Sequence, residues 1–270
     1  MRRCCLARRA ATIPVVVISQ AAGLVAVIAL LPVVPGTATP HDLWWGAAAG
    51  LAGGAGVALL YHALAIGTMS VVAPTTAVAA VIIPVVASIT LGERPGILAI
   101  AGILLGVGAI VLVSQQGTYD LRPTTQDQGP KTESRSLGVS AALAAGVAIG
   151  FFLLALAQTH RQAGLWPLVA SRTVSVSLIA LLGVARRQSL RMPGGLLGLT
   201  IAGGLLDMLA NALYMIAAQM GPLSPVVTLS SLYPATTVLL ARGMLAERLS
   251  ALQKIGVVCA LVAVVLIVRG

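Results

Sequence analysis

Runs of about 20 apolar residues, separated by short polar gaps, cover almost the whole 270-residue chain. A membrane-spanning helix needs ~20 mostly apolar residues. The pattern therefore predicts an all-α polytopic membrane protein. Its nine predicted spans are residues 11–34, 43–67, 71–91, 97–114, 137–158, 165–185, 195–220, 225–246 and 252–268.

The only long gap between runs is residues 115–136. It holds six charged residues together with Pro, Thr and Gln, and too few apolar residues to bury itself. We expect a solvated linker there. It would join a first repeat at residues 1–114 to a second repeat at residues 137–270.

The two parts share a sequence pattern that indicates one helical hairpin occurring twice. Gly67 and Glu93 of the first part match Gly221 and Glu247 of the second, each 154 residues further along. An Arg follows both Glu residues, and charged residues are scarce in this chain. An internal repeat in a very apolar chain is typical of transporters built from two halves.

The first part lacks a counterpart to the first helix of the second. Pro14 aligns with Pro167, which leaves the run at 137–158 without a partner. Either the protein has nine spans, or Met1 lies inside a longer reading frame, which the complete second repeat favours. A signal peptide is a third interpretation, but its apolar region would be about 7–15 residues, and the run at 11–34 is longer.

The composition supports a membrane protein. Hydrophobic residues make up 58% of the chain and charged residues 9%, against roughly 25% charged in a soluble domain. The net charge of +10 comes from Lys and Arg in the gaps, where they orient helices and meet lipid phosphates. The expected partners are the lipid bilayer and a small-molecule substrate. A homodimer is left open, and nucleic acid is not expected.

The side on which the basic residues lie predicts an orientation. Twelve of the 17 Lys and Arg residues fall on the side of the N-terminus in the nine-span topology, with Lys254 at the start of the last run counted there, three fall on the other side and two lie within spans. Cytoplasmic loops carry the excess of Lys and Arg. The N-terminus is therefore expected in the cytoplasm, and the C-terminus on the opposite side.

No motif for catalysis or metal binding is present. The sequence has no phosphate loop, no nucleophile elbow and no His-Glu metal motif. Cys4, Cys5 and Cys259 have neither disulfide-framework nor metal-ligand spacing. We therefore expect no enzyme, no cofactor and no metal.

A motif series in the second repeat resembles a known family. It consists of Gly221-Pro222-Leu223-Ser224, Ser230-Ser231-Leu232-Tyr233-Pro234, Leu245-Ala246-Glu247-Arg248, Gln253 and Gly256. The pattern is similar to the EamA-type family of the drug/metabolite transporter superfamily. In the first repeat it is weaker, since Ala80 replaces Pro234 and Ala99 replaces Gln253.

The resemblance implies ten helices in two tandem inverted repeats of five, so this chain lacks the first helix. It also implies export or exchange of small metabolites across a bacterial inner membrane, and a cytoplasmic C-terminus. We expect a secondary transporter, an exporter of metabolites or drugs. The alternative is a non-transporting or truncated membrane protein, such as an accessory subunit.

Two ionisable residues lie inside predicted spans that are antiparallel neighbours. Arg172 is 13 residues before the end of one run, and Asp207 is 12 residues after the start of the next. At ~1.5 Å per residue they lie at nearly equal depth, so an ion pair is geometrically allowed. One interpretation is a structural pair. The other is that Asp207 exchanges a proton or binds substrate while Arg172 tunes its pKa.

Further polar residues surround this pair in the sequence. Asn211 and Tyr214 follow Asp207 on one helix face and predict a polar stripe, which lines a wet cavity or bonds to a neighbouring helix. Gln20 and Thr173 match across the repeat and are candidates to face the cavity. Ordinary hydrogen bonding between helices is their simpler role.

Overall fold

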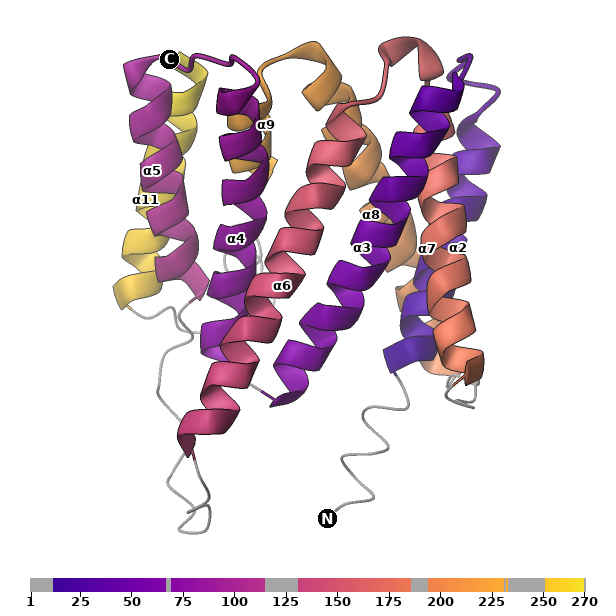
Figure 1. Cartoon of the computed structure of the whole chain (residues 1–270), viewed down its shortest axis with the longest axis horizontal. Coiled ribbons are helices and arrows are strands. Elements are labelled where there is room, and N and C mark those ends of the chain that lie inside the picture. The colour runs from indigo at the N-terminus through magenta and orange to yellow at the C-terminus, as the bar shows by residue number, and fades with distance from the viewer. Residues whose placement is uncertain are drawn as a thin grey trace. The chain divides into compact units, whose positions relative to one another are not determined.

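The computed structural model describes residues 12–66, 69–114, 131–185, 194–230, 232 and 251–269 (Figure 1). These residues form helices and the turns between them, and no strand occurs in this part of the chain. The elements are α2 (Thr12–Leu30), α3 (Pro40–Ile66), α4 (Met69–Thr90), α5 (Ile97–Ser114), α6 (Lys131–Ala157), the 3₁₀ helix η1 (Arg161–Ala163), α7 (Trp166–Ala185), α8 (Gly194–Met220), α9 (Leu223–Ser230) and α11 (Ala251–Arg269).

The prediction of an all-α fold is confirmed, and each predicted run overlaps one described helix. Of the run at 225–246, residue 231 and everything after residue 232 lie outside the described residues. The clearest difference is at α6, which begins at Lys131, so residues 131–136 of the expected linker are helical. Lys, Glu and Arg are good helix formers, so the polarity of this segment disfavours the membrane but not the helix.

Apolar surface on these helices identifies their surroundings. Four described segments are long and apolar enough to cross a membrane: Pro40–Ile66, Leu137–Ala157, Trp166–Ala185 and Leu196–Met220. Four shorter apolar helices accompany them: Pro14–Leu30, Thr75–Thr90, Ile97–Leu112 and Lys254–Ile267. Large apolar side chains such as Leu199 and Leu104 are mostly exposed. Contact with lipid removes the hydration cost of such a surface, so the chain is a multi-pass membrane protein.

The helices form two compact units, which do not coincide with the two sequence repeats. Unit 1 comprises Met1–Gly54 and Phe152–Met220, and unit 2 comprises Ala55–Phe151 and Gly221–Gly270. Two pairs of repeat-related helices fall in the same unit, whereas α3 is divided between the units after Gly54. Helices α2 and α7 are both in unit 1, while α5 and α11 are both in unit 2.

Unit 1 is held together by glycines at the helix contacts. Gly46 and Gly50 of α3 lie so close to α7 that an added Cβ would come within 3.0 Å of the backbone of Pro167 and Ser171, respectively. The contact advances in the same direction on both helices, so they run parallel. Small residues four apart allow this approach between membrane helices.

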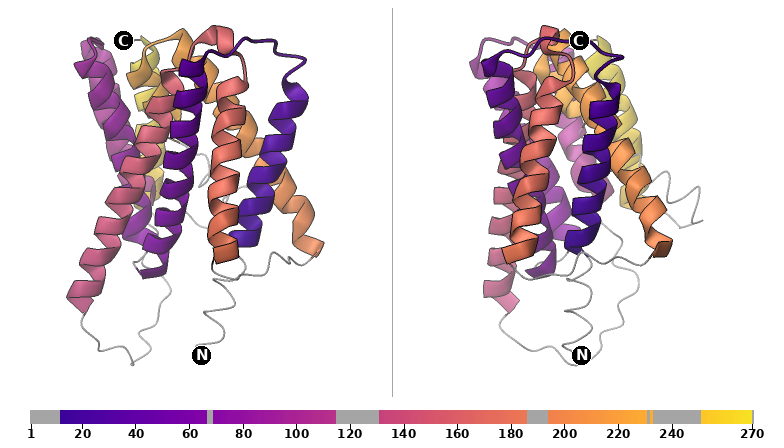
Figure 2. Two further views of the ribbon diagram at one scale, coloured as in Figure 1. Left: turned by 45° about the vertical axis from the view of Figure 1, so that its right-hand side comes forward. Right: turned by 90° about the vertical axis from the view of Figure 1, so that its right-hand side faces the viewer.

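Helices α2 and α8 of unit 1 cross in the same way. A Cβ on Gly204 would meet the backbone of Ser19, and one on Gly23 would lie 3.2 Å from the carbonyl oxygen of Gly204. Figure 2 shows α2, in indigo, beside α7 and α8, in orange tones. The absence of two side chains lets α2 and α8 approach each other closely.

Unit 2 contains a polar contact between the two sequence repeats. Glu93, in the turn after α4, accepts a hydrogen bond from the backbone nitrogen of Ser224 at 3.1 Å and another from its hydroxyl. Ser88 and Ser224 hydroxyls lie 2.6 Å apart. Burial raises the pKa of the Glu93 carboxyl, but hydrogen bonds from Ser224 and Ser88 outweigh it and hold the pKa below its ordinary value. Glu93 thus caps the start of α9, where a negative charge is favourable.

Candidate functional site

A polar cluster in unit 1 joins three otherwise apolar helices. Arg172 of α7 is buried, and its guanidinium donates one hydrogen bond to Gln20 Oε1 on α2. A second bond goes to the Asp207 carboxylate on α8. The ion pair that the sequence allowed is therefore present, and Gln20 is its third member.

Small side chains make room for the guanidinium. A Cβ on Gly23 would lie 3.9 Å from Arg172 Nε, and Gly204 allows α2 and α8 to approach at this level. Ser175, one turn beyond Arg172, is buried, and its hydroxyl lies 3.2 Å from the Arg172 carbonyl oxygen and 3.4 Å from Gln20 Oε1. Sequence reasoning missed Ser175, although its i+3 spacing from Arg172 is a signal that it shares that helix face.

The two charges of the pair differ in accessibility. The Arg172 side chain is 9% exposed, whereas that of Asp207 is 57% exposed. A charge inside a membrane helix is costly unless it faces a partner or water. The arginine is enclosed between its two partners, while more than half of the Asp207 side chain is not covered by protein.

The predicted stripe on α8 divides into parts with different surroundings. Asn211 donates to the backbone carbonyl of Asp207 at 2.8 Å, an interaction within its own helix. Tyr214 is buried, and its hydroxyl donates to the carbonyl oxygen of Leu153 at 2.9 Å. Tyr214 therefore links α8 to α6, whereas Asp207 links α8 to α7 through its pair with Arg172.

Thr173 also lies apart from the cluster. It is exposed, and its hydroxyl donates to the Val169 carbonyl oxygen at 2.8 Å, one turn back on α7. Of the six predicted site residues, the structure brings together Gln20, Arg172 and Asp207. Asn211 joins through the backbone only, and Tyr214 and Thr173 do not join.

A hollow of about 370 Å³ lies between α2 and α8. Its lining includes Ser19 and Gly203, the latter one turn before Asp207 on α8. The remaining lining residues are Val15, Leu196, Leu199 and Thr200. The lining is mainly apolar with two hydroxyl groups, and it includes Leu199, which belongs to the exposed apolar surface described above. The hollow is therefore an open groove on that surface.

Comparison with known proteins identifies the family. The EamA-like transporter family matches residues 5–115 and residues 136–269, which together make up most of the chain. The chain belongs to this family. It is therefore a membrane transporter of the drug/metabolite transporter superfamily, and the resemblance noted in the sequence is confirmed.

Solved structures support the fold of this family member. A protein crystal structure with 19% sequence identity covers 95% of the chain and 88% of its own length, with a TM-score of 0.74. At this identity the likeness shows the fold alone. No curated protein matches the sequence.

Proposed function

We propose that this EamA-type protein is a secondary transporter that exports small organic metabolites or drugs across a bacterial inner membrane. Family membership supports transport, and the sequence has no phosphate loop with which to use ATP directly. Transport would proceed by alternating access between the two repeats. The observation that points to Asp207 as the site is its exposed carboxylate, which pairs with the buried Arg172.

In this proposal Asp207 exchanges Arg172 for a proton or a cationic group, while Arg172 keeps its bond to Gln20. A proton or a cationic group that binds the open side of Asp207 competes with the guanidinium for the carboxylate. Gln20 remains as a neutral acceptor for Arg172 during that exchange. Occupation of Asp207 thus weakens the contact between α7 and α8 without leaving the arginine wholly unpaired.

The test is transport by the purified protein in liposomes that contain a pH-sensitive dye. A panel of amino acids, polyamines and the cationic dye ethidium is added in turn, and proton movement is recorded together with uptake of each compound. We expect at least one compound to move protons with the unaltered chain. Asp207→Asn should lose the pH dependence of transport while the protein still inserts.

Two further variants separate a functional pair from a structural one. Thr173→Val, outside the cluster, should behave as the unaltered protein. Arg172→Gln combined with Asp207→Asn removes both charges and should lack pH-dependent transport even when it is well expressed. Full pH-dependent transport by this double variant would show that the pair is structural. Failure of the unaltered chain with every compound would favour the non-transporting alternative.

A further inference from the structure

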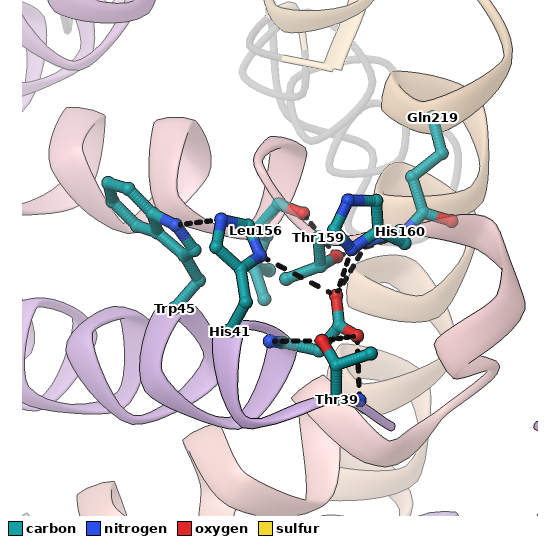
Figure 3. Close-up of polar contacts among 8 residues, drawn as sticks. Thr39, His41, Trp45, Leu156, Thr159, His160 and Gln219 are labelled. Atoms are coloured by element: carbon teal, nitrogen blue, oxygen red, sulfur yellow. Dashed lines mark hydrogen bonds and ion pairs between the residues drawn. The ribbon is translucent and has the colours of Figure 1, made fainter. Parts of the chain in front are cut away.

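A second polar cluster in unit 1 lies at the start of α3, away from the Arg172 site. His41 and Asp42 lie in the first turn of α3, and His160 lies in the turn between α6 and η1. Figure 3 labels both histidines. Asp42 and His160 are 118 residues apart in sequence. One ligand atom from each of the three residues lies within 4.8 Å of the other two.

Asp42 is fixed before any ligand binds. Its side chain is buried, and its Oδ2 accepts hydrogen bonds from the Thr39 backbone nitrogen at 3.0 Å and from the Thr39 hydroxyl at 2.7 Å. These bonds form a capping box at the start of α3. The helix cap uses only Oδ2, so it does not explain why two imidazoles lie beside Oδ1.

His160 holds its position through the backbone of its turn. Its backbone nitrogen donates to Asp42 Oδ1 at 2.8 Å, and its Nδ1 lies 2.9 Å from the same oxygen. The preceding Thr159 hydroxyl donates to the Leu156 carbonyl oxygen and accepts a bond from Gln219, both at 2.8 Å. The turn is therefore tied to α3, α6 and α8 within unit 1.

His41 approaches the same oxygen from the other side. Its Nδ1 is 4.0 Å from Asp42 Oδ1, and its ring centroid is 5.0 Å from that of His160. Both imidazoles are more than half exposed, so an ion can reach them from solvent. Three ligands around one Zn²⁺, each at about 2.0–2.2 Å, would lie roughly 3.3 Å apart in tetrahedral geometry. The exposed His41 ring needs only a small shift to reach it.

We propose that His41, Asp42 and His160 bind a divalent transition metal of the zinc type. Two imidazoles and one carboxylate are ligands that zinc accepts, and three protein ligands leave the fourth position for water. The hydrogen bonds from Thr39 to Asp42 are the kind of outer contacts that orient metal ligands. The bound ion crosslinks the turn after α6 to the start of α3.

Metal binding changes the tautomer of His41. The Trp45 indole nitrogen donates to His41 Nε2 at 2.9 Å, which places the proton of a neutral His41 ring on Nδ1. Coordination through Nδ1 moves that proton to Nε2, with no net proton gained or lost, and breaks the bond to Trp45. Figure 3 shows this indole directly beside the ring, so the site carries its own fluorescent reporter.

The test is titration of the full chain in detergent with ZnCl₂ after removal of metals. The protein carries no histidine tag, and Cys4, Cys5 and Cys259 are replaced by serine in every sample because thiolates bind zinc. Binding is measured by competition with a chromogenic chelator and by tryptophan emission. We expect one zinc ion per chain and a change in emission. Trp45→Phe should abolish the emission change yet bind zinc at least as tightly.

Single substitutions decide the ligand set. His41→Gln and His160→Gln should each weaken zinc binding about tenfold or more. The backbone bond from residue 160 to Asp42 survives in both variants, so both should still fold without zinc. His160→Gln also loses the Nδ1 contact with Asp42 Oδ1 and should unfold at a slightly lower temperature than the parent. His62→Gln, a histidine outside the cluster, should bind as the parent does. Equal affinity in all variants, equal loss in the His62 variant, or no bound zinc in the parent would each overturn the proposal.

Discussion

Arg172 and Asp207 differ in how far their side chains are exposed. Substituting one of them should therefore lower the stability of the protein by a different amount than substituting the other. The arginine is nearly sealed while the carboxylate is more than half exposed. Removing the acid leaves a cation enclosed by protein, whereas removing the arginine leaves an anion that the protein covers only in part. On the proposal that Asp207 faces a wet transport path, the second change is the smaller perturbation, because a hydrated charge keeps most of its solvation.

We therefore predict an order of stability for three variants. Asp207→Asn should lower the unfolding temperature most, with a cost toward the low end of roughly 3–5 kcal/mol because the pair is half exposed. Arg172→Gln should cost less, and the double variant should be more stable than Asp207→Asn alone. Thermal unfolding in detergent, followed by helical signal, measures all three. A double variant less stable than either single one would contradict the unequal pair.

The helix contacts of unit 1 depend on glycine at particular positions. A Cβ on Gly50 would overlap the backbone of Ser171, which cannot move aside as a flexible side chain can. Gly198 on α8 has nothing within 4 Å of where its Cβ would lie. The same substitution should therefore have opposite effects at the two sites.

Gly50→Ala should destabilise the protein by roughly 1–3 kcal/mol, because α3 and α7 must separate. Gly198→Ala should stabilise it by about 0.4–1 kcal/mol, because alanine restricts the unfolded chain and favours helix. Unfolding temperatures of the two variants and the parent give the comparison. Equal destabilisation by both would show that the close approach of α3 and α7 is not what Gly50 provides.

The cap on α9 predicts a pH dependence of stability in unit 2. The pKa of Glu93 lies below its ordinary value of 4.5 in the folded chain, so the fold stabilises the charged form of this carboxylate. This stabilisation is fully present above 4.5 and is lost as the pH falls through the lowered folded pKa. Glu93→Gln should unfold at a lower temperature than the parent at pH 7. The difference should shrink in acid, and a difference that is constant from pH 7 to pH 3 would contradict the cap.

At the scale of the whole molecule, the sequence predicts elements better than contacts. Long apolar runs set the helices, because the bilayer requires each crossing to satisfy its own backbone. The depth of Arg172 and Asp207 follows from helix rise, and so their pairing was predictable. The partition of the chain into units was not, since each unit takes helices from both repeats. The His41–Asp42–His160 cluster was missed because no short motif spans 118 residues.

Orientation in the membrane is a whole-molecule property for which two lines of reasoning disagree. The side of the N-terminus carries twelve Lys and Arg residues and the other side three. The positive-inside rule then puts the N-terminus in the cytoplasm and the C-terminus outside it. The family resemblance implies a cytoplasmic C-terminus. We give the charge count more weight, because the basic residues that it counts belong to this chain.

A reporter that is active only in the cytoplasm, fused after Gly270, should therefore be inactive, while the same reporter inserted at Gly117 should be active. Four of the twelve basic residues are Arg2, Arg3, Arg8 and Arg9. If these four arginines set the orientation, replacing them with Gln should make the reporter active after Gly270 and inactive at Gly117. If the loops downstream set it, the activity at both sites should be unchanged. An active reporter after Gly270 in the unaltered chain would contradict the charge-based orientation and place the His41–Asp42–His160 cluster, one crossing from the N-terminus, on the cytoplasmic side.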